Sequence, residues 1–129
     1  MGMNIMKAQD VMTKSVVSMK KDVSAKDIAI QLVSGHFSGL PITDEKERII
    51  GVVTEYDLLN KIREGKKLET LSAEDVMEKN PVTVDIHLAV RDVLDIMLDQ
   101  GILRIPVTDG LCLVGVVSRS DILKTYVEQ

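Results

Sequence analysis

The sequence has very few aromatic side chains, a single cysteine and no long apolar run. Aromatic residues make up 2% of the 129 residues although 45% are apolar, so we expect a core of Val, Ile, Leu, Met and Ala. Cys112 cannot form an intramolecular disulfide and stands in an apolar run, which predicts a buried structural side chain rather than a catalytic thiol. A chain without disulfides fits a reduced, cytoplasmic setting.

Signals of membrane insertion and of nucleic-acid binding are also missing. No apolar stretch approaches the ~20 residues that cross a bilayer, and the N-terminus lacks the basic start and apolar run of a signal peptide. The formal net charge is −4, with acidic and basic residues interspersed, which disfavours a nucleic-acid surface. We therefore expect neither a membrane nor a nucleic acid as partner.

Motifs of catalysis and metal binding are absent as well. The sequence has no Gly-rich phosphate loop and no nucleophile–base arrangement. His36 and His87 lie far apart and have no accompanying cluster of Cys or His, so we predict neither a metal site nor a catalytic dyad. Asp57 and Asp121 could act as carboxylates in a hydrolysis, but no partner group nearby supports an enzyme.

Internal repetition is the strongest positive signal. Three blocks recur in the same order, 64 or 65 residues apart: Ala8–Met12 with Ala73–Met77, Leu40–Asp44 with Ile105–Asp109, and Gly51–Asp57 with Gly115–Asp121. Because there are only two copies, a pair of half-domains related by a pseudo-two-fold axis is favoured over an extended array.

Each copy is expected to form a short helical turn followed by a βαββα series. In the first copy we predict the turn at Gln9–Met12 and strands at Val16–Met19, Leu40–Thr43 and Ile49–Val53. The first helix begins after Ser24 and the second after Thr54.

The spacing of apolar residues predicts which helix faces are buried. The expected stripe is Ile28, Ala29, Leu32 and Val33 in the first copy, and Val90, Val93, Leu94, Met97 and Leu98 in the second. Met12 and Met77 are expected to pack the short helical turns. The charged segment Lys61–Thr70 predicts a solvated linker.

The element order and the motifs Leu40-Pro41-Ile42-Thr43-Asp44, Ile105-Pro106-Val107-Thr108-Asp109 and Gly-Val-Val-Thr/Ser-x-x-Asp resemble the cystathionine-beta-synthase (CBS) domain. Two in tandem resemble a Bateman module, with repeats at 8–60 and 73–125 and a linker at 61–72. The resemblance implies an α+β fold of tandem βαββα repeats, packed through their sheets with pseudo-two-fold symmetry and leaving two clefts. It also implies a non-catalytic regulatory module that commonly forms a homodimer.

The repeated Thr54-x-x-Asp57 and Ser118-x-x-Asp121 motifs each follow a buried strand and open a helix. The same spacing occurs in Ser24–Asp27 and Ser72–Asp75, so spacing alone predicts only a helix cap. The resemblance implies more, namely that the aspartate holds the two ribose hydroxyls of an adenosyl ligand. A carboxylate suits this role because its two oxygens accept hydrogen bonds and its charge strengthens them.

The resemblance also places the adenine against main-chain groups near the first and second strands of each repeat. These positions are Val17, Ser18, Pro41 and Ile42 in the first repeat, and Val82, Thr83, Pro106 and Val107 in the second. Most of these side chains are equally expected in the core.

A phosphate group requires positive charge, and the two repeats differ in what they offer. Arg104 stands where family members often carry a phosphate-binding arginine, whose planar guanidinium suits phosphate. The first repeat has Gly39 there, preceded by Ser38. Arg119 corresponds to Glu55, which would repel phosphate. We therefore expect unequal clefts and favour the one that contains Asp121.

The leading hypothesis is a sensor that requires no cofactor. It binds AMP, ADP, ATP or S-adenosylmethionine and transmits the signal to a partner protein. The alternative is an assembly module with empty clefts, which would dimerise without responding to nucleotides.

Overall fold

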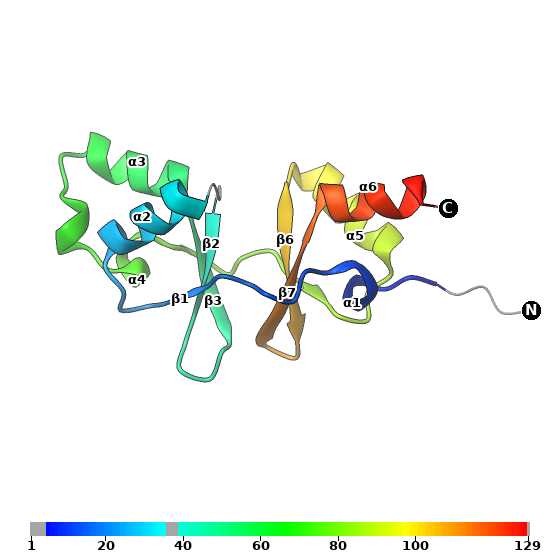
Figure 1. The fold of residues 1–129 in the computed structure, drawn as a ribbon. Helices are drawn as coiled ribbons and strands as arrows, with labels where there is room; N and C mark the ends of the chain where they lie inside the picture. The colour runs from blue at the N-terminus through cyan, green and yellow to red at the C-terminus, as the bar shows by residue number, and fades with distance from the viewer. Residues whose placement is uncertain (1–4, 36–38, 129) are drawn as a thin grey trace, which may run out of the picture. The chain divides into compact units, whose positions relative to one another are not determined.

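The computed structural model describes residues 5–35 and 39–128 and separates into two compact units (Figure 1). The first, here called the β2–β3 unit, is Val17–Pro81. The second, the β6–β7 unit, combines the described residues up to Val16 with those from Val82 onward. Each unit contains one small mixed sheet and several helices. The predicted α+β fold with two repeats is therefore confirmed.

The β2–β3 unit is built on a four-stranded sheet in the order β1-β2-β3-β4. Its strands are β1 (Met19–Lys20), β2 (Gly39–Thr43), β3 (Ile49–Thr54) and β4 (Glu78–Lys79). β1 runs parallel to β2, and the other neighbours are antiparallel. Its helices are α2 (Ala25–Gly35), α3 (Glu55–Arg63), the 3-10 turn η1 (Leu68–Thr70) and α4 (Ala73–Val76).

The core of this unit lies between the sheet and its helices. Leu40, Ile42 and Val53 alternate along β2 and β3, are at most 1% exposed, and join Ile28 of α2 and Leu58 of α3 in one cluster. Complete burial of such a side chain contributes about 1.5–3 kcal/mol. The opposite face of the same strands is therefore the face on which side chains can serve another purpose.

The β6–β7 unit repeats this architecture with the strand order β5-β6-β7. Its strands are β5 (Val84–Asp85), β6 (Arg104–Asp109) and β7 (Cys112–Ser118), and its helices are α1 (Ala8–Val11), α5 (Val90–Gln100) and α6 (Arg119–Val127). The core cluster again joins alternate strand residues to the helices: Ile105, Val107, Val117, Val93, Met97 and Ile122.

Each unit takes its first short helix from the other repeat. α1 packs on α5, α6 and β7, and Ala8 N donates to Leu88 O at 2.8 Å. α4 packs on α2, α3 and β3, and Ala73 N donates to Val23 O at 2.7 Å. The packing units therefore differ from the contiguous sequence repeats.

A glycine in β3 and another in β7 make room for the methionine that follows the short helix of each unit. A Cβ atom on Gly51 would lie 2.5 Å from Met77 Sδ, and one on Gly115 would lie 2.5 Å from Met12 Sδ. Both distances are far below van der Waals contact. The predicted packing role of Met12 and Met77 is thus confirmed, and it explains the glycine of each Gly-Val-Val block.

The prediction of a strand at Val16–Met19 is wrong in its placement. Pairing with β2 begins only at Met19, which lies opposite Ile42, and Val16 N donates to Lys14 O at 3.0 Å. β4 was not predicted. Val33 and Leu98, expected on the buried helix faces, occupy equivalent positions and are 76% and 56% exposed.

Two further segments differ from expectation. Cys112 is half-buried rather than buried. Within the segment expected to be a solvated linker, α3 continues to Arg63, and Leu68 packs against the core together with Leu71. Within the described ranges, no helix combines the length and apolarity that crossing a bilayer requires.

Candidate functional site

The junction between β3 and α3 holds the first candidate carboxylate. Thr54 is the N-cap of α3, and its Oγ1 accepts from Asp57 N at 3.2 Å. Thr54 N and Thr54 Oγ1 both donate to Asp57 Oδ2 at 2.8 Å. The predicted cap is therefore present, and both residues are half-buried.

The junction between β7 and α6 repeats this geometry. Ser118 N donates to Asp121 Oδ2 at 2.8 Å, and Asp121 N donates to Ser118 Oγ at 3.1 Å. In both units the capping bonds use Oδ2, so Oδ1 of each aspartate lies outside them. A carboxylate in this position can cap its helix and still accept a hydrogen bond from a ligand.

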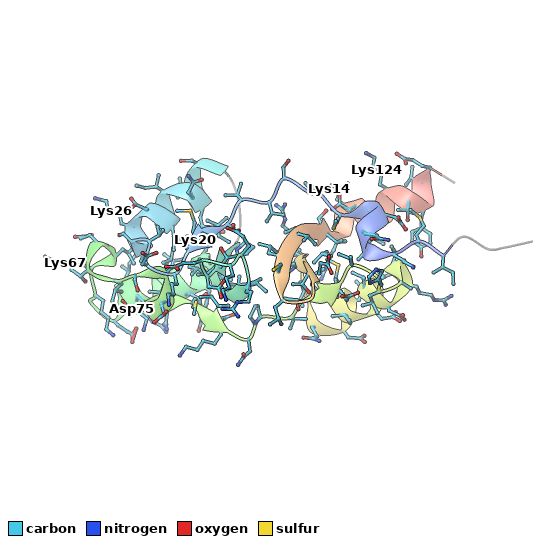
Figure 2. The ribbon with its side chains drawn as sticks, turned by 90° about the horizontal axis from the view of Figure 1, so that it is seen from below. Lys14, Lys20, Lys26, Lys67, Asp75 and Lys124 are labelled. Atoms are coloured by element: carbon cyan, nitrogen blue, oxygen red, sulfur yellow. The ribbon has the colours of Figure 1, made fainter. Side chains whose placement is uncertain are left out.

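The same cap occurs a third time, away from the two candidate positions. Ser72 N donates to Asp75 Oδ2 at 2.8 Å at the start of α4, and this N–H bond is the main reason that the pKa of Asp75 is lowered. Figure 2 labels Asp75 on this helix. Capping geometry alone therefore does not mark a binding site, and position on the sheet must decide.

In the β2–β3 unit, strand register places several of the predicted residues on one sheet face. Thr54 lies opposite Gly39, and Val52 lies between Pro41 of β2 and Glu78 of β4. Directly paired residues project to the same side of a sheet, and so do alternate residues of one strand. All five positions therefore share the face opposite the helix-covered core.

The β6–β7 unit has the equivalent rows. Arg104 lies opposite Ser118, and Pro106 lies opposite Val116. Thr13 forms an isolated antiparallel bridge with Val116, the same relation that Glu78 has to its β3 partner. Thr13 and Glu78 are thus structural equivalents.

The residues predicted to meet an adenine separate into two classes. Val17 and Ser18 precede β1, Val82 and Thr83 precede β5, and the two valines are each 40% exposed. By contrast, the side chains of Ile42 and Val107 are fully buried in the two cores. Only their main-chain atoms could contact a base, whereas Val17 and Val82 can offer side chains.

The two predicted arginines flank Ser118. Arg104 begins β6 opposite it, and Arg119 follows it as the first residue of α6. Arg119 Nε donates to Ile102 O at 3.0 Å, which holds this side chain beside the start of β6. Both arginines therefore lie next to Ser118, the N-cap residue of α6 in this unit. Ser38, the counterpart that precedes Gly39, lies outside the described residues.

Glu78 is a member of the candidate site that sequence reasoning missed. Its pKa is raised by the negative charge of Asp57, by partial burial and by a hydrogen bond between the two carboxyl groups. The signal was present in the repeat, because Glu78 follows Met77 as Thr13 follows Met12. Glu78 reaches the candidate face only because β4 pairs with β3, and two residues are too few to show a strand periodicity in the sequence.

Other features of the described residues offer less. His87 Nδ1 lies 2.9 Å from Asp85 Oδ2 on the exposed surface. Among the described residues, no three metal-ligating side chains lie close enough together to hold a metal ion. His36 lies outside those residues. A hollow of about 460 Å³ contains Lys21, Ile50 and Lys79 but none of the predicted site residues.

Comparison with known proteins identifies the repeats. The family model of the CBS domain matches residues 8–64 and 73–128. The chain is 31% identical over 117 residues to the uncharacterized protein MK0525 of Methanopyrus kandleri, covering 89% of this chain and 60% of that protein. The chain thus spans less than two thirds of that relative.

Two solved structures share the fold and carry ligands. The structure of CBSX2 in complex with AMP is 27% identical in sequence and has a TM-score of 0.83. The match covers 95% of this chain and 97% of that one. The CBS domain pair of protein MJ0100, in complex with 5′-methylthioadenosine and S-adenosyl-L-methionine, is 25% identical with a TM-score of 0.80, covering 97% of this chain and 98% of that one. Since both repeats match the family model, this chain belongs to the CBS domain family and carries two such domains in tandem.

Proposed function

We propose that this chain is a regulatory module that binds an adenine nucleotide or a related adenosyl compound and signals its presence to a partner protein. One observation carries the proposal: both units place a capping aspartate at the edge of an equivalent sheet face, with one carboxylate oxygen outside the capping bonds. The ligands of CBSX2 and of the MJ0100 domain pair support the adenosyl class.

The proposed contacts follow from the positions of these residues. Oδ1 of Asp57 or Asp121 accepts from the ribose hydroxyls, and the half-exposed Val17 or Val82 packs against the base. Main-chain groups near Ser18, Pro41 and Ile42, or near Thr83, Pro106 and Val107, read the edge of the base. Arg104 and Arg119 attract phosphate in the β6–β7 unit.

We propose regulation rather than catalysis, because the aspartates are committed to helix caps and the described residues around them include no nucleophile–base pair. A ligand changes the population of a signalling state only through its different affinity for the two states. At 100 times its dissociation constant, a ligand that binds only the folded protein adds about 2.7 kcal/mol to the free energy of unfolding. A cytoplasmic location remains part of this proposal.

The exposed helix faces support a homodimer as the unit of function. α3 exposes Leu59 and Ile62, and the equivalent positions of α6 are Leu123 and Tyr126, each at least 50% exposed. Clustered apolar residues of this kind are typical of interaction surfaces. Leu59→Glu together with Leu123→Glu is expected to halve the mass measured by light scattering. An unchanged mass would contradict this assignment.

Thermal unfolding with a panel of compounds tests the function. We expect AMP, ADP, ATP or S-adenosylmethionine to raise the melting temperature by about 10 °C at saturation. NADH extends the panel to a larger adenosyl compound. Asp121→Asn and Asp57→Asn should reduce this shift, with the larger loss for Asp121→Asn if phosphate is required.

Asp75→Asn is the matched control. It removes the same carboxylate from the same capping geometry but from a helix outside the candidate faces. The shift should persist in this variant. A shift lost equally in all three variants would show that the aspartates act only through stability. No shift with any compound would favour the alternative, an assembly module without a small-molecule ligand.

A further inference from the structure

The charges around the capping aspartate differ systematically between the units. At three equivalent positions the β2–β3 unit is more negative than the β6–β7 unit: Gly39 against Arg104, Glu55 against Arg119, and Glu78 against Thr13. All three differences have the same sign, so they change the electrostatic field at the proposed ligand position cumulatively.

Of the charged residues in this comparison, Glu78 is the one that lies on the sheet face itself in the β2–β3 unit. Its backbone pairs with Val52, two residues before Thr54, so its side chain shares the face on which Thr54 and Pro41 lie. The lysine that follows it, Lys79, alternates to the other side of the strand. Glu78 therefore adds a negative charge to this face that its neighbour does not offset there.

Glu78 is also the neighbour of Asp57, the residue proposed to bind the ribose. The negative charge of Asp57 is the main reason that the pKa of Glu78 is raised. Two acidic groups held this close repel each other when both are ionised. A positive group placed beside them relieves this repulsion, whereas a phosphate adds to it.

We propose that Glu78 determines ligand charge at the β2–β3 unit, rejecting phosphate and favouring an adenosyl compound that carries a sulfonium or ammonium group instead. This inference rests on the proposed function. It makes the two units complementary, because the β6–β7 unit, with Arg104 and Arg119, prefers a phosphorylated compound.

Three probes with the same adenosyl core but different charge test the inference. AMP is anionic, 5′-methylthioadenosine is neutral, and S-adenosylmethionine carries a sulfonium and an ammonium group. Binding is measured by titration calorimetry in the full chain carrying Asp121→Asn. This variant weakens binding at the β6–β7 unit, so the measured affinity is mainly that of the β2–β3 unit. Circular dichroism confirms that each variant is folded.

In that background, Glu78→Gln is expected to weaken the binding of S-adenosylmethionine roughly fivefold and to strengthen the binding of AMP roughly fivefold. A partly exposed charge interaction of about 1 kcal/mol corresponds to this factor. The affinity for 5′-methylthioadenosine should not change. Glu69→Gln is the matched control, because Glu69 is exposed on η1 in the same unit and the charge change is identical.

The reciprocal change is Thr13→Glu, measured in a chain carrying Asp57→Asn. This change should weaken the binding of AMP at the β6–β7 unit by a similar factor. The inference is overturned if Glu78→Gln changes all three affinities alike, or changes none of them while Asp57→Asn still abolishes binding. If no probe binds even the unaltered chain, the proposed function itself fails.

Discussion

Replacing Gly51 with alanine tests how Met77, at the end of α4, packs against β3. The new Cβ would lie 2.5 Å from Met77 Sδ, 2.8 Å from Met77 Cγ and 2.9 Å from the carbonyl oxygen of Glu78. The thioether can rotate away, but the carbonyl belongs to the backbone of β4. Alanine must therefore displace part of the β3–β4 ladder, which carries the Glu78 side chain.

The equivalent change in the other unit is expected to be milder. The three atoms nearest to a Cβ on Gly115 would all belong to the Met12 side chain, at 2.5, 2.9 and 3.1 Å. Overpacking of a core costs about 1–3 kcal/mol. We expect Gly51→Ala to lower the free energy of unfolding by about 3 kcal/mol and Gly115→Ala by about 1 kcal/mol, because a flexible side chain relaxes more easily than a backbone.

Urea unfolding followed by circular dichroism measures both losses. Combining Gly51→Ala with Met77→Ala removes the two closest contacts, so the double variant should lose less stability than the sum of the single changes, by about 1 kcal/mol. Gly101→Ala serves as a control, because Gly101 has φ +65° and nothing within 4 Å, so alanine there costs only backbone strain. Strict additivity, or a Gly51→Ala as mild as Gly115→Ala, would refute the reasoning.

Three further predictions concern charge. Glu78→Gln should raise the free energy of unfolding at pH 7 by less than about 1 kcal/mol; because the folded-state pKa of Glu78 is raised, this gain should vanish in melts below its ordinary pKa of 4.5. The pKa of Asp75 is lowered by the hydrogen bond from Ser72 N, so at neutral pH the wild-type chain should be more stable than Asp75→Asn. This difference in the free energy of unfolding should disappear as the pH falls below 3.8 and through the folded-state pKa, which unfolding measurements across an acid titration would detect. Arg104→Gln should weaken AMP roughly fivefold in calorimetry and leave 5′-methylthioadenosine unchanged; equal losses for both ligands would assign Arg104 a structural role.

The elements with strong local signals were predictable from the sequence. Thr54 and Ser118 begin helices because their side chains accept from backbone N–H groups of the first turn, and this depends on neighbouring residues alone. Ile28 and Leu32 are buried at helical spacing as expected. The repeat supplied independent support, since the same pattern occurs twice.

Features that depend on pairing between distant segments were not predictable. β4 consists of two charged residues, Glu78 and Lys79, and exists because it pairs with Val52 and Gly51 of β3. The start of β1 at Met19 likewise depends on its register with β2. The candidate aspartates could be named from the motif, but the acidic neighbour of Asp57 became visible only through the tertiary structure.

The account depends on whether the capping carboxylates hold a sugar. A crystal structure of this chain grown with AMP would test this most directly. We predict a ribose hydroxyl within hydrogen-bonding distance of Asp121 Oδ1, with the Ser118 cap intact and the phosphate near Arg104. A bound nucleotide whose ribose contacts neither aspartate would contradict the central claim.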